Sequence, residues 1–208
     1  RITLHQSVPV SPHAASMPPI TLGLVPGTNI TVEECILGMV TRSANDAAAA
    51  LGELLGGDEH RFAQMMTLRA RALGMSRTRF RNASGLPDAK QVTTARDMAL
   101  LARHRVHDFP RDYAYFSVPS FRFQGRTITG HDYLLDRYAG TDGIKTGYTN
   151  ASGFNLVTSI RTDGRHLIGV VLGGKTSRWR DQRMASLLEE NLDRAYAGLF
   201  DASGLFAC

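Results

Sequence analysis

Cysteine is scarce in this chain of 208 residues, in which only Cys35 and Cys208 occur. Two cysteines cannot supply the disulfide framework of a small secreted scaffold, and neither stands at a spacing typical of a metal site. The sequence therefore predicts no metal ion and no other cofactor. Cys35 falls within an apolar helical pattern, so we interpret it as a small residue of the core.

Lysine is also scarce, since Lys90, Lys145 and Lys175 are the only three among 24 basic residues. The net charge of +5 is carried almost entirely by arginines, which are scattered along the chain, as between Arg69 and Arg105. A nucleic-acid surface needs basic residues gathered in one place with aromatic residues between them, so we expect no nucleic-acid partner. A mildly basic surface that faces an anionic substrate or envelope polymer fits this composition.

No stretch of the sequence is apolar over enough residues to cross a membrane, and no signal peptide is present. The chain opens on Arg-Ile-Thr-Leu, which is typical of the middle of a longer protein. We therefore expect any membrane attachment to depend on segments outside these 208 residues.

Hydrophobic residues make up 43% of the chain, which is enough to build a core, and the length predicts one domain or one domain with a fragment. Residues 1–30 hold five of the eight prolines, which predicts an irregular but ordered loop. Thr31 and Glu34 have the spacing of a helix capping box. Apolar periodicity predicts helices near residues 35–40, 47–55, 58–73, 94–104 and 178–200.

The second half of the chain is rich in patterns typical of strands. We expect a short strand and turn over 80–87, small strands and hairpins over 113–129, and longer strands over 142–149, 154–160 and 166–172. Asp163-Gly164 is a strong hairpin signal between the last two strands. This order predicts an α+β fold, in which a helical subdomain (about 31–110) packs against an antiparallel sheet with a C-terminal helix (about 111–200).

The stretch Asp-Gly-Ile-Lys-Thr-Gly-Tyr-Thr, residues 142–149, predicts a short strand that carries one buried cation. Lys145 would supply charge, Thr146 a directed hydrogen bond, and Gly147 the space for a substrate strand to lie alongside. Together they form an edge to which a carboxylate can dock. The alternative is a solvated lysine in a hairpin.

Ser43 and Asn45 stand where one helix breaks and an alanine-rich core helix begins. A Ser-x-Asn sequence about a hundred residues before a Lys-Thr-Gly strand resembles two of the three motifs of the penicillin-recognising serine enzymes. The alternatives are that Ser43 only caps a helix and that Asn45 is only a turn residue.

The sequence around both motifs extends the resemblance. Pro-Gly-x-x-Ile-Thr-Val-Glu-Glu, Arg-Ser-Ala-Asn-Asp-Ala-Ala, Ala-Arg-Asp-Met-Ala, Ser-Gly-Phe-Asn-Leu-Val and Gly-Gly-Lys-Thr-Ser are similar to D-alanyl-D-alanine carboxypeptidases of the low-molecular-weight penicillin-binding type. The resemblance covers residues 2 to about 195 and implies a DD-peptidase/β-lactamase-like fold.

One motif of that family is missing. The family carries its acylated serine and a lysine base in Ser-x-x-Lys, and none of the three lysines here has a serine three residues before it. In the family this motif precedes the region that matches residues 1–30, so we expect an N-terminally truncated catalytic domain. These 208 residues would then lack the nucleophile and the first sheet strands, and would be inactive alone.

The resemblance implies a serine-type carboxypeptidase that removes the terminal D-alanine of the peptidoglycan pentapeptide stem through an acyl-enzyme. It also implies a periplasmic or cell-envelope location and, in the intact enzyme, acylation by β-lactam antibiotics. Ser43 would relay a proton to the leaving nitrogen. Asn45 would position the substrate amide and the absent lysine, and Lys145 would keep that lysine neutral enough to act as a base.

The remaining implied roles concern substrate binding. Thr146 and Gly147 would receive the terminal carboxylate, and the backbone amide of Tyr148 would be one oxyanion donor. Arg180 lies where the family often has a second cation for that carboxylate. His131 stands where relatives often show Asn or Arg, so it is either a substrate contact or a structural polar residue.

Two other functions remain open. A class A-type β-lactamase shares the fold, but no Glu-x-x-Leu-Asn-like sequence for activating the deacylating water is found between Ser43 and Lys145. A catalytically inactive cell-wall-binding or regulatory module would explain the missing nucleophile. A Ser-x-x-Lys upstream in the gene would favour the enzyme over the module.

Overall fold

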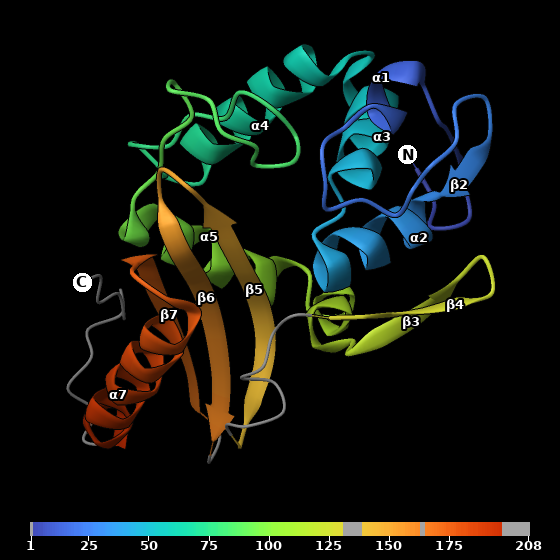
Figure 1. The fold of residues 1–208 in the computed structure, drawn as a ribbon. Coiled ribbons are helices and arrows are strands. Elements are labelled where there is room, and N and C mark those ends of the chain that lie inside the picture. Colours follow the sequence, from blue (N-terminus) through green and yellow to red (C-terminus); the bar gives the residue numbers. More distant parts are fainter. Residues whose placement is uncertain (1, 131–138, 163–164, 197–208) are drawn as a thin grey trace. The chain divides into compact units, whose positions relative to one another are not determined.

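The structure is a computed structural model that describes residues 2–130, 139–162 and 165–196 (Figure 1). The chain divides into two compact units, and each is described here by itself. The helical unit comprises Arg1–Ala72, Thr78–Val92 and Val118–His131, and the sheet unit comprises Leu73–Arg77, Thr93–Ser117 and Asp132–Cys208.

The helical unit contains short strands as well as helices. Its elements are β1 (Ser7–Pro9), α1 (Pro12–Ala15), β2 (Asn29–Thr31), α2 (Val32–Leu37), the π-helix η1 (Gly38–Arg42), α3 (Asn45–Gly56), α4 (Glu59–Ala72), β3 (Ser120–Phe123) and β4 (Arg126–Thr129). β1 pairs with β2 and β3 with β4, both antiparallel. The prediction of an irregular loop over 1–30 was therefore partly wrong, because Ser7–Pro9 forms a strand that pairs with Asn29–Thr31.

Helix α3 is the centre of this unit because alanines allow it to be approached closely from several sides. Ala47, Ala49 and Ala50 are fully buried and pack in one core cluster with β1, β2, α2 and the β3–β4 hairpin. Cys35 belongs to the same cluster, as the sequence predicted. The capping box of α2 is confirmed, since Thr31 Oγ1 accepts from the Glu34 amide and the Glu34 carboxylate accepts from the Thr31 amide.

Two local predictions were wrong. Residues 80–87 do not form a strand; the described pairing there is an isolated bridge between Arg79 and Val92, and side chains such as that of Gln91 bind the backbone in place of a ladder. Residues 112–117, which alternate as a strand would, form the 3₁₀-helix η2 (Asp112–Ser117). In that segment the contacts of η2 with the sheet outweigh the β-propensity of its aromatic residues.

The sheet unit has an antiparallel sheet of three strands in the order β5 (Thr141–Thr149), β6 (Gly153–Thr162) and β7 (Arg165–Gly174). Helix α5 (Ala95–Asp108) packs on one face, and α7 (Ser177–Tyr196) contacts β6 and β7. Asp163-Gly164 and the last residues of the predicted C-terminal helix lie outside the described residues. Because α5 packs with the sheet, the structure groups it there, whereas the sequence placed 31–110 in one helical subdomain.

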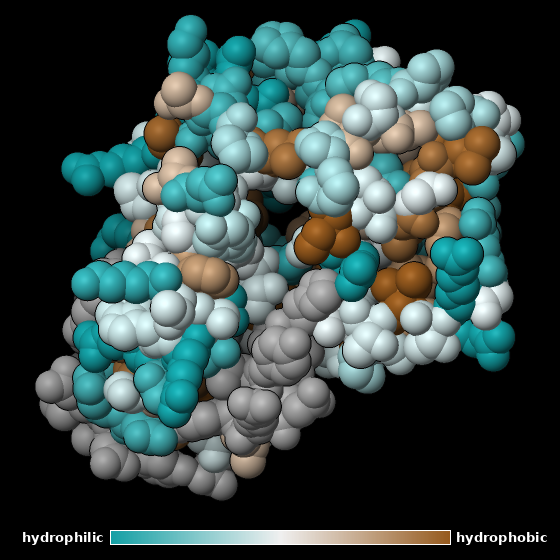
Figure 2. Space-filling view, in the orientation of Figure 1, coloured by the Kyte–Doolittle hydropathy of each residue, from teal (hydrophilic) through white to brown (hydrophobic). Residues whose placement is uncertain are grey.

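Two apolar clusters hold the sheet between its helices. Val157 and Val170 pack with Ala99, Ala102 and Val106 of α5. On the other face a second cluster joins α7 to the sheet through Leu156, Ile160, Val171, Met184 and Leu188. The outward surface of α7 is mostly hydrophilic in Figure 2, as expected for a helix that buries one face. Among the described residues, no helix has the length and apolar character needed to cross a membrane.

Candidate functional site

Ser43 occupies an unusual backbone position at the end of the π-helix η1. It adopts the left-handed conformation, with φ 57° and ψ 39°, and its amide donates to the carbonyls of Gly38 and Met39. A non-glycine residue rarely adopts this conformation, and both π-turns and such backbone outliers concentrate at functional sites. Ser43 therefore ends the preceding helix and does not cap α3, whose N-cap position is Ala44.

Asn45 is the first residue of α3 and is held by the loop that precedes β2. Its backbone amide donates to the Ile20 carbonyl at 2.8 Å, and its side-chain Nδ2 donates to the Pro18 carbonyl at 2.9 Å. The residue is only 9% exposed. These bonds fix the side chain in one orientation and use one of its two amide hydrogens.

Asp46 is a residue of this segment to which sequence reasoning assigned no role. Its carboxylate accepts from the backbone amides of Leu22, Gly23 and Leu24, each at 3.0 Å, and from the amide of Ala47 at 2.9 Å. With 1% of its surface exposed, it anchors the 18–24 loop to the start of α3. The available signal was an acidic residue in the first helical turn, which predicts a favourable dipole interaction but not these loop partners.

Lys145, Thr146 and Gly147 lie on β5, which has a strand neighbour on one side only in the described sheet. Lys145 is half-buried rather than buried, and its Nζ donates to the Thr146 carbonyl at 2.7 Å. Thr146 is also half-buried, and Gly147 is exposed. The prediction of a strand is confirmed. The prediction of a buried cation was only partly right, since Lys145 is half-buried on a strand that has one neighbour in the described sheet.

Tyr148 is 56% exposed and lies over a neighbouring aromatic residue. Its ring centroid is 4.5 Å from that of Phe154, the residue directly opposite on β6, and its hydroxyl donates to Asn150 at 2.9 Å. The side chain is therefore held along the sheet, while the role predicted for Tyr148 involves its backbone amide.

Arg180 lies near this strand but its guanidinium is engaged. Nη2 is 2.7 Å from the Asp181 carboxylate, Nε donates to the same oxygen, and Nη1 donates to the Asn155 carbonyl at 3.4 Å. The side chain is 6% exposed, and Asn155 pairs with Gly147. Arg180 thus binds the backbone of β6 at Asn155, the residue opposite Gly147. Its predicted contact with a substrate carboxylate stays a prediction. His131 lies outside the described residues.

Asp142 forms a second polar centre, at the start of β5. Its Oδ1 accepts from Tyr113 Oη at 2.9 Å and from Ser159 Oγ at 2.6 Å, and its Oδ2 accepts from Arg161 Nε at 2.8 Å. Its backbone carbonyl accepts from Ser117 Oγ at 2.5 Å. The sequence motif included Asp142, but no local pattern indicated these partners.

Two ionisable groups beside Asp142, those of Tyr113 and His166, have shifted pKa values. Burial raises the pKa of the Tyr113 hydroxyl, so this group stays protonated and remains a donor to Asp142. Burial also lowers the pKa of His166, although the nearby Asp142 carboxylate opposes that effect. His166 Nε2 contacts Ser159 Oγ and lies 3.8 Å from Asp142 Oδ1. The neutral imidazole is therefore the favoured form.

The predicted site residues fall in both units. Ser43 and Asn45 belong to the helical unit, whereas Lys145, Thr146, Gly147, Tyr148 and Arg180 belong to the sheet unit. Within each unit the structure brings the predicted residues close in space.

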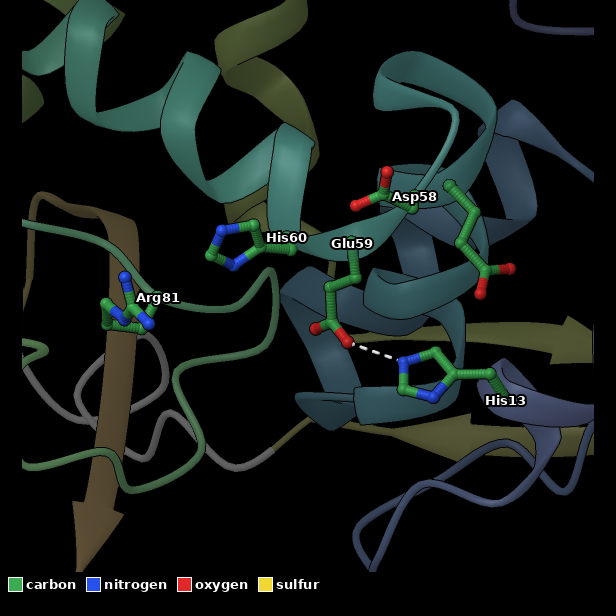
Figure 3. Close-up of a pocket in the computed structure, with 6 residues that line it drawn as sticks. His13, Asp58, Glu59, His60 and Arg81 are labelled. Carbon is green, nitrogen blue, oxygen red and sulfur yellow. Dashed lines mark hydrogen bonds and ion pairs between the residues drawn. The ribbon is translucent and has the colours of Figure 1, made fainter.

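The helical unit also has an open pocket, and neither Ser43 nor Asn45 lines it. It has a volume of about 380 Å³ and is lined by His13, Glu53, Asp58, Glu59, His60 and Arg81. Figure 3 shows His13 of α1 turned toward Glu59 at the start of α4, and the two side chains are joined by a 2.7 Å contact. Among the described residues, no cluster of His, Cys, Asp and Glu side chains is suited to hold a metal ion.

Comparisons with known proteins show which family this sequence is similar to. Residues 1–176 match the model of the peptidase S11 family, D-alanyl-D-alanine carboxypeptidase. The chain is 35% identical over 166 residues to D-alanyl-D-alanine carboxypeptidase DacA of Escherichia coli K12, an alignment that covers 79% of this chain and 41% of DacA. The chain thus spans less than half of that relative.

Solved structures give the same result for the fold. The D-alanyl-D-alanine carboxypeptidase DacD of Francisella tularensis superimposes with a TM-score of 0.87 at 30% identity, over 91% of this chain and 59% of DacD. Penicillin-binding protein 5 of Haemophilus influenzae gives a TM-score of 0.87 at 30% identity, over 92% of this chain and 57% of that protein. The α+β fold is therefore that of the DD-peptidases, and the chain belongs to the D-alanyl-D-alanine carboxypeptidase family, peptidase S11.

Proposed function

We propose that this chain forms the substrate-binding and proton-relay part of a serine-type D-Ala-D-Ala carboxypeptidase. The enzyme would remove the terminal D-alanine of a peptidoglycan pentapeptide stem by way of an acyl-enzyme. The observation that carries the proposal is the Lys145–Thr146–Gly147 sequence on a strand with one open edge in the described sheet, where cation, hydroxyl and space stand in a row.

The open edge of β5 suits a peptide with a free C-terminus. A substrate strand can add to the sheet through backbone hydrogen bonds, with its last carboxylate at the Thr146 hydroxyl and in the field of the Lys145 ammonium. Gly147 and Tyr148 are exposed, so the Tyr148 backbone amide can approach the scissile carbonyl as an oxyanion donor. Arg180 would act through the strand, since its guanidinium is bound to Asp181.

The helical unit would supply the proton relay. The left-handed backbone of Ser43 and the two bonds that fix Asn45 are the kind of preorganisation that proton transfer to a leaving amine requires. In this proposal Ser43 passes the proton to the leaving nitrogen, and Asn45 holds the substrate amide.

The nucleophile would come from residues upstream of Arg1. None of the three lysines in the chain completes a Ser-x-x-Lys motif. The same proposal places the enzyme in the periplasm or cell envelope, where its substrate is, and makes β-lactam antibiotics acylating ligands of the longer protein.

The test compares the 208-residue chain with a version extended by its own upstream sequence. The readouts are covalent labelling by a fluorescent penicillin and D-alanine release from a peptide that ends in D-Ala-D-Ala. We expect neither from the short chain and both from the extended one. In the extended protein Lys145→Ala should reduce D-alanine release on the order of a hundredfold, because it removes a charge that contacts the substrate carboxylate.

The matched control is Lys175→Ala, which removes an exposed lysine of the same unit and should leave both readouts unchanged. Turnover by the short chain would contradict the missing nucleophile. An upstream sequence without Ser-x-x-Lys, together with absent labelling, would support a non-catalytic wall-binding module. Fast hydrolysis of penicillin in place of a long-lived adduct would support a β-lactamase.

A further inference from the structure

Strand β5 has little apolar patterning to fix how it pairs with β6. It contains Gly143 and Gly147, and Ile144 is its one side chain in an apolar core cluster. The side chains from Lys145 onward are polar except for the ring of Tyr148. Register is weakly specified in strands that are rich in glycine and polar on both faces, because a shifted pairing buries nearly the same surface. Burial of Ile144 alone is a weak constraint on the register, so a further contact is needed to hold Lys145 opposite its present partner.

The pairing of β5 with β6 changes at Asp142. Thr141 lies opposite Ile160 and Gly143 opposite Ser159, so Asp142 is one extra residue on β5, a β-bulge. Every later pair follows from that insertion, and Lys145 stands opposite Val157. Val157 packs with α5, whereas its neighbour Leu156 packs with α7. Without the extra residue the pairs would shift by one, and Lys145 would stand opposite Leu156, on the other face of the sheet.

The extra residue is fixed by side chains from two elements, η2 and β6. Tyr113 and Ser117 of η2 bind its carboxylate and its carbonyl, and Ser159 and Arg161 of β6 bind its carboxylate. Ser159 is fully buried, so this bond is shielded from water. The next residue is a glycine with φ +146°, where a Cβ atom would lie 3.0 Å from Phe116 Cβ. The bulge is therefore both bonded and closely packed.

The structure assigns Asp142 the role of a positioning residue: its anchored bulge sets the register of β5, and thereby the face of the sheet from which Lys145 projects. The consequence for substrate binding rests on the proposed function. The consequence for register does not, because it concerns only contacts within the sheet unit. Asp142 touches no reacting atom in this proposal; it acts through the strand.

The register can be read by disulfide formation between engineered cysteines. A Cβ built on Gly147 lies 4.0 Å from Asn155 Cβ, which is within the range for a disulfide. Gly147→Cys with Asn155→Cys therefore reports the native register. Thr146→Cys with Asn155→Cys reports the register shifted by one. Both pairs are made in the 208-residue chain with Cys35→Ala and Cys208→Ser.

With Asp142 present, we expect the native pair to oxidise and the shifted pair to stay reduced. With Asp142→Ala, we expect the native pair to lose yield and the shifted pair to gain it. Hydrogen exchange of the amides of β5 should then accelerate by roughly tenfold or more, since several hydrogen bonds to a charged group are lost. Glu190→Gln, a change of an exposed carboxylate in the same unit, is the matched control and should alter neither readout.

Asp142→Asn keeps the size of the side chain and guards against simple unfolding. We expect this variant to show the same shift in smaller measure, with α7 still protected from exchange. If β5 keeps its native disulfide and its protection in both variants, the proposal is overturned. Equal loss of protection in β5 and α7 in both variants would also overturn it, because Asp142 would then serve general stability only. Neither readout needs substrate, so failure here is distinct from failure of the carboxypeptidase proposal.

Discussion

Each of the two carboxylate oxygens of Asp46 lies 3.0 Å from the backbone nitrogen of Leu22. The two residues are 24 positions apart, and the contact joins the 18–24 loop to the first turn of α3. Because Asn45 also binds this loop, through Pro18 and Ile20, the loop and the Ser43–Asn45 segment are held as one piece. The order of this segment therefore depends on a buried anion with backbone partners.

Replacing that anion should destabilise the protein. Asp46→Asn substitutes an NH₂ group for one oxygen, so at least one loop amide loses its acceptor in a buried place. We expect the free energy of unfolding to fall by about 3 kcal/mol, measured by urea denaturation. Asp58→Asn is the matched control, because Asp58 caps α4 in an exposed position and Asn caps a helix equally well. Equal midpoints for the two variants would contradict this account of Asp46.

The thiol of Cys35 should be inert in the native protein. Burial raises its pKa to about 12, and the residue is 0% exposed, so neither the thiolate nor access is available near neutral pH. In a Cys208→Ser background, we expect a thiol reagent at pH 8 to modify the folded protein on the order of a thousandfold more slowly than the urea-unfolded chain. Rapid native-state modification would show that the α2–α3 core opens far more readily than its packing indicates.

Stability should fall in acid partly through His166. Its pKa is lowered in the folded state, chiefly by burial, so the unfolded chain binds the proton more readily. The contribution of His166 to the free energy of unfolding is therefore fully present above the ordinary histidine pKa of about 6.5, and it declines as the pH falls below that value. Asp142, which raises this pKa, and Arg161 and His107, which lower it, are the charged neighbours that set the size of the effect.

The corresponding experiment compares urea midpoints at pH 7.5 and pH 5 for the unmodified chain and for His166→Gln. We expect the midpoint to drop less in the variant, because glutamine does not titrate. His60→Gln is the control, an exposed histidine of the helical unit whose removal should leave the drop unchanged. If the urea midpoint falls by the same amount in all three proteins, His166 makes no contribution, and protonation of carboxylates alone accounts for the loss of stability in acid.

Much of the fold could be predicted from local sequence. The capping box of Thr31 and Glu34, the cap of α4 at Asp58 and the cap of α5 at Thr94 are all present, because a cap joins residues three positions apart. The β5 strand around Lys145 and the antiparallel pairing of β6 with β7 are also confirmed. Predictions failed where local preference and packing disagree, as in Asp112–Ser117, which alternates like a strand and forms a 3₁₀-helix beside β5.

In the candidate site, too, the sequence predicted local features but not long-range contacts. The sequence identified the segments of Ser43 and Lys145, because those residue types recur at fixed spacing in a known family. It could not identify the partners of Asp46 and Asp142, nor the ion pair that engages Arg180. Most of those contacts join residues seventeen or more positions apart, and an isolated aspartate carries no sign of which distant amide or hydroxyl it will meet.

The residue order alone determined where most of the helices and the three long strands lie, which family the motifs resemble, and which residues are candidates for the chemistry. These features depend on periodicity, caps and turn residues that act within a few positions. Only the tertiary structure decided the left-handed backbone of Ser43, the half-buried state of Lys145 and the bulge at Asp142. Each of these arises when segments from different parts of the chain compete for the same space and the same hydrogen bonds.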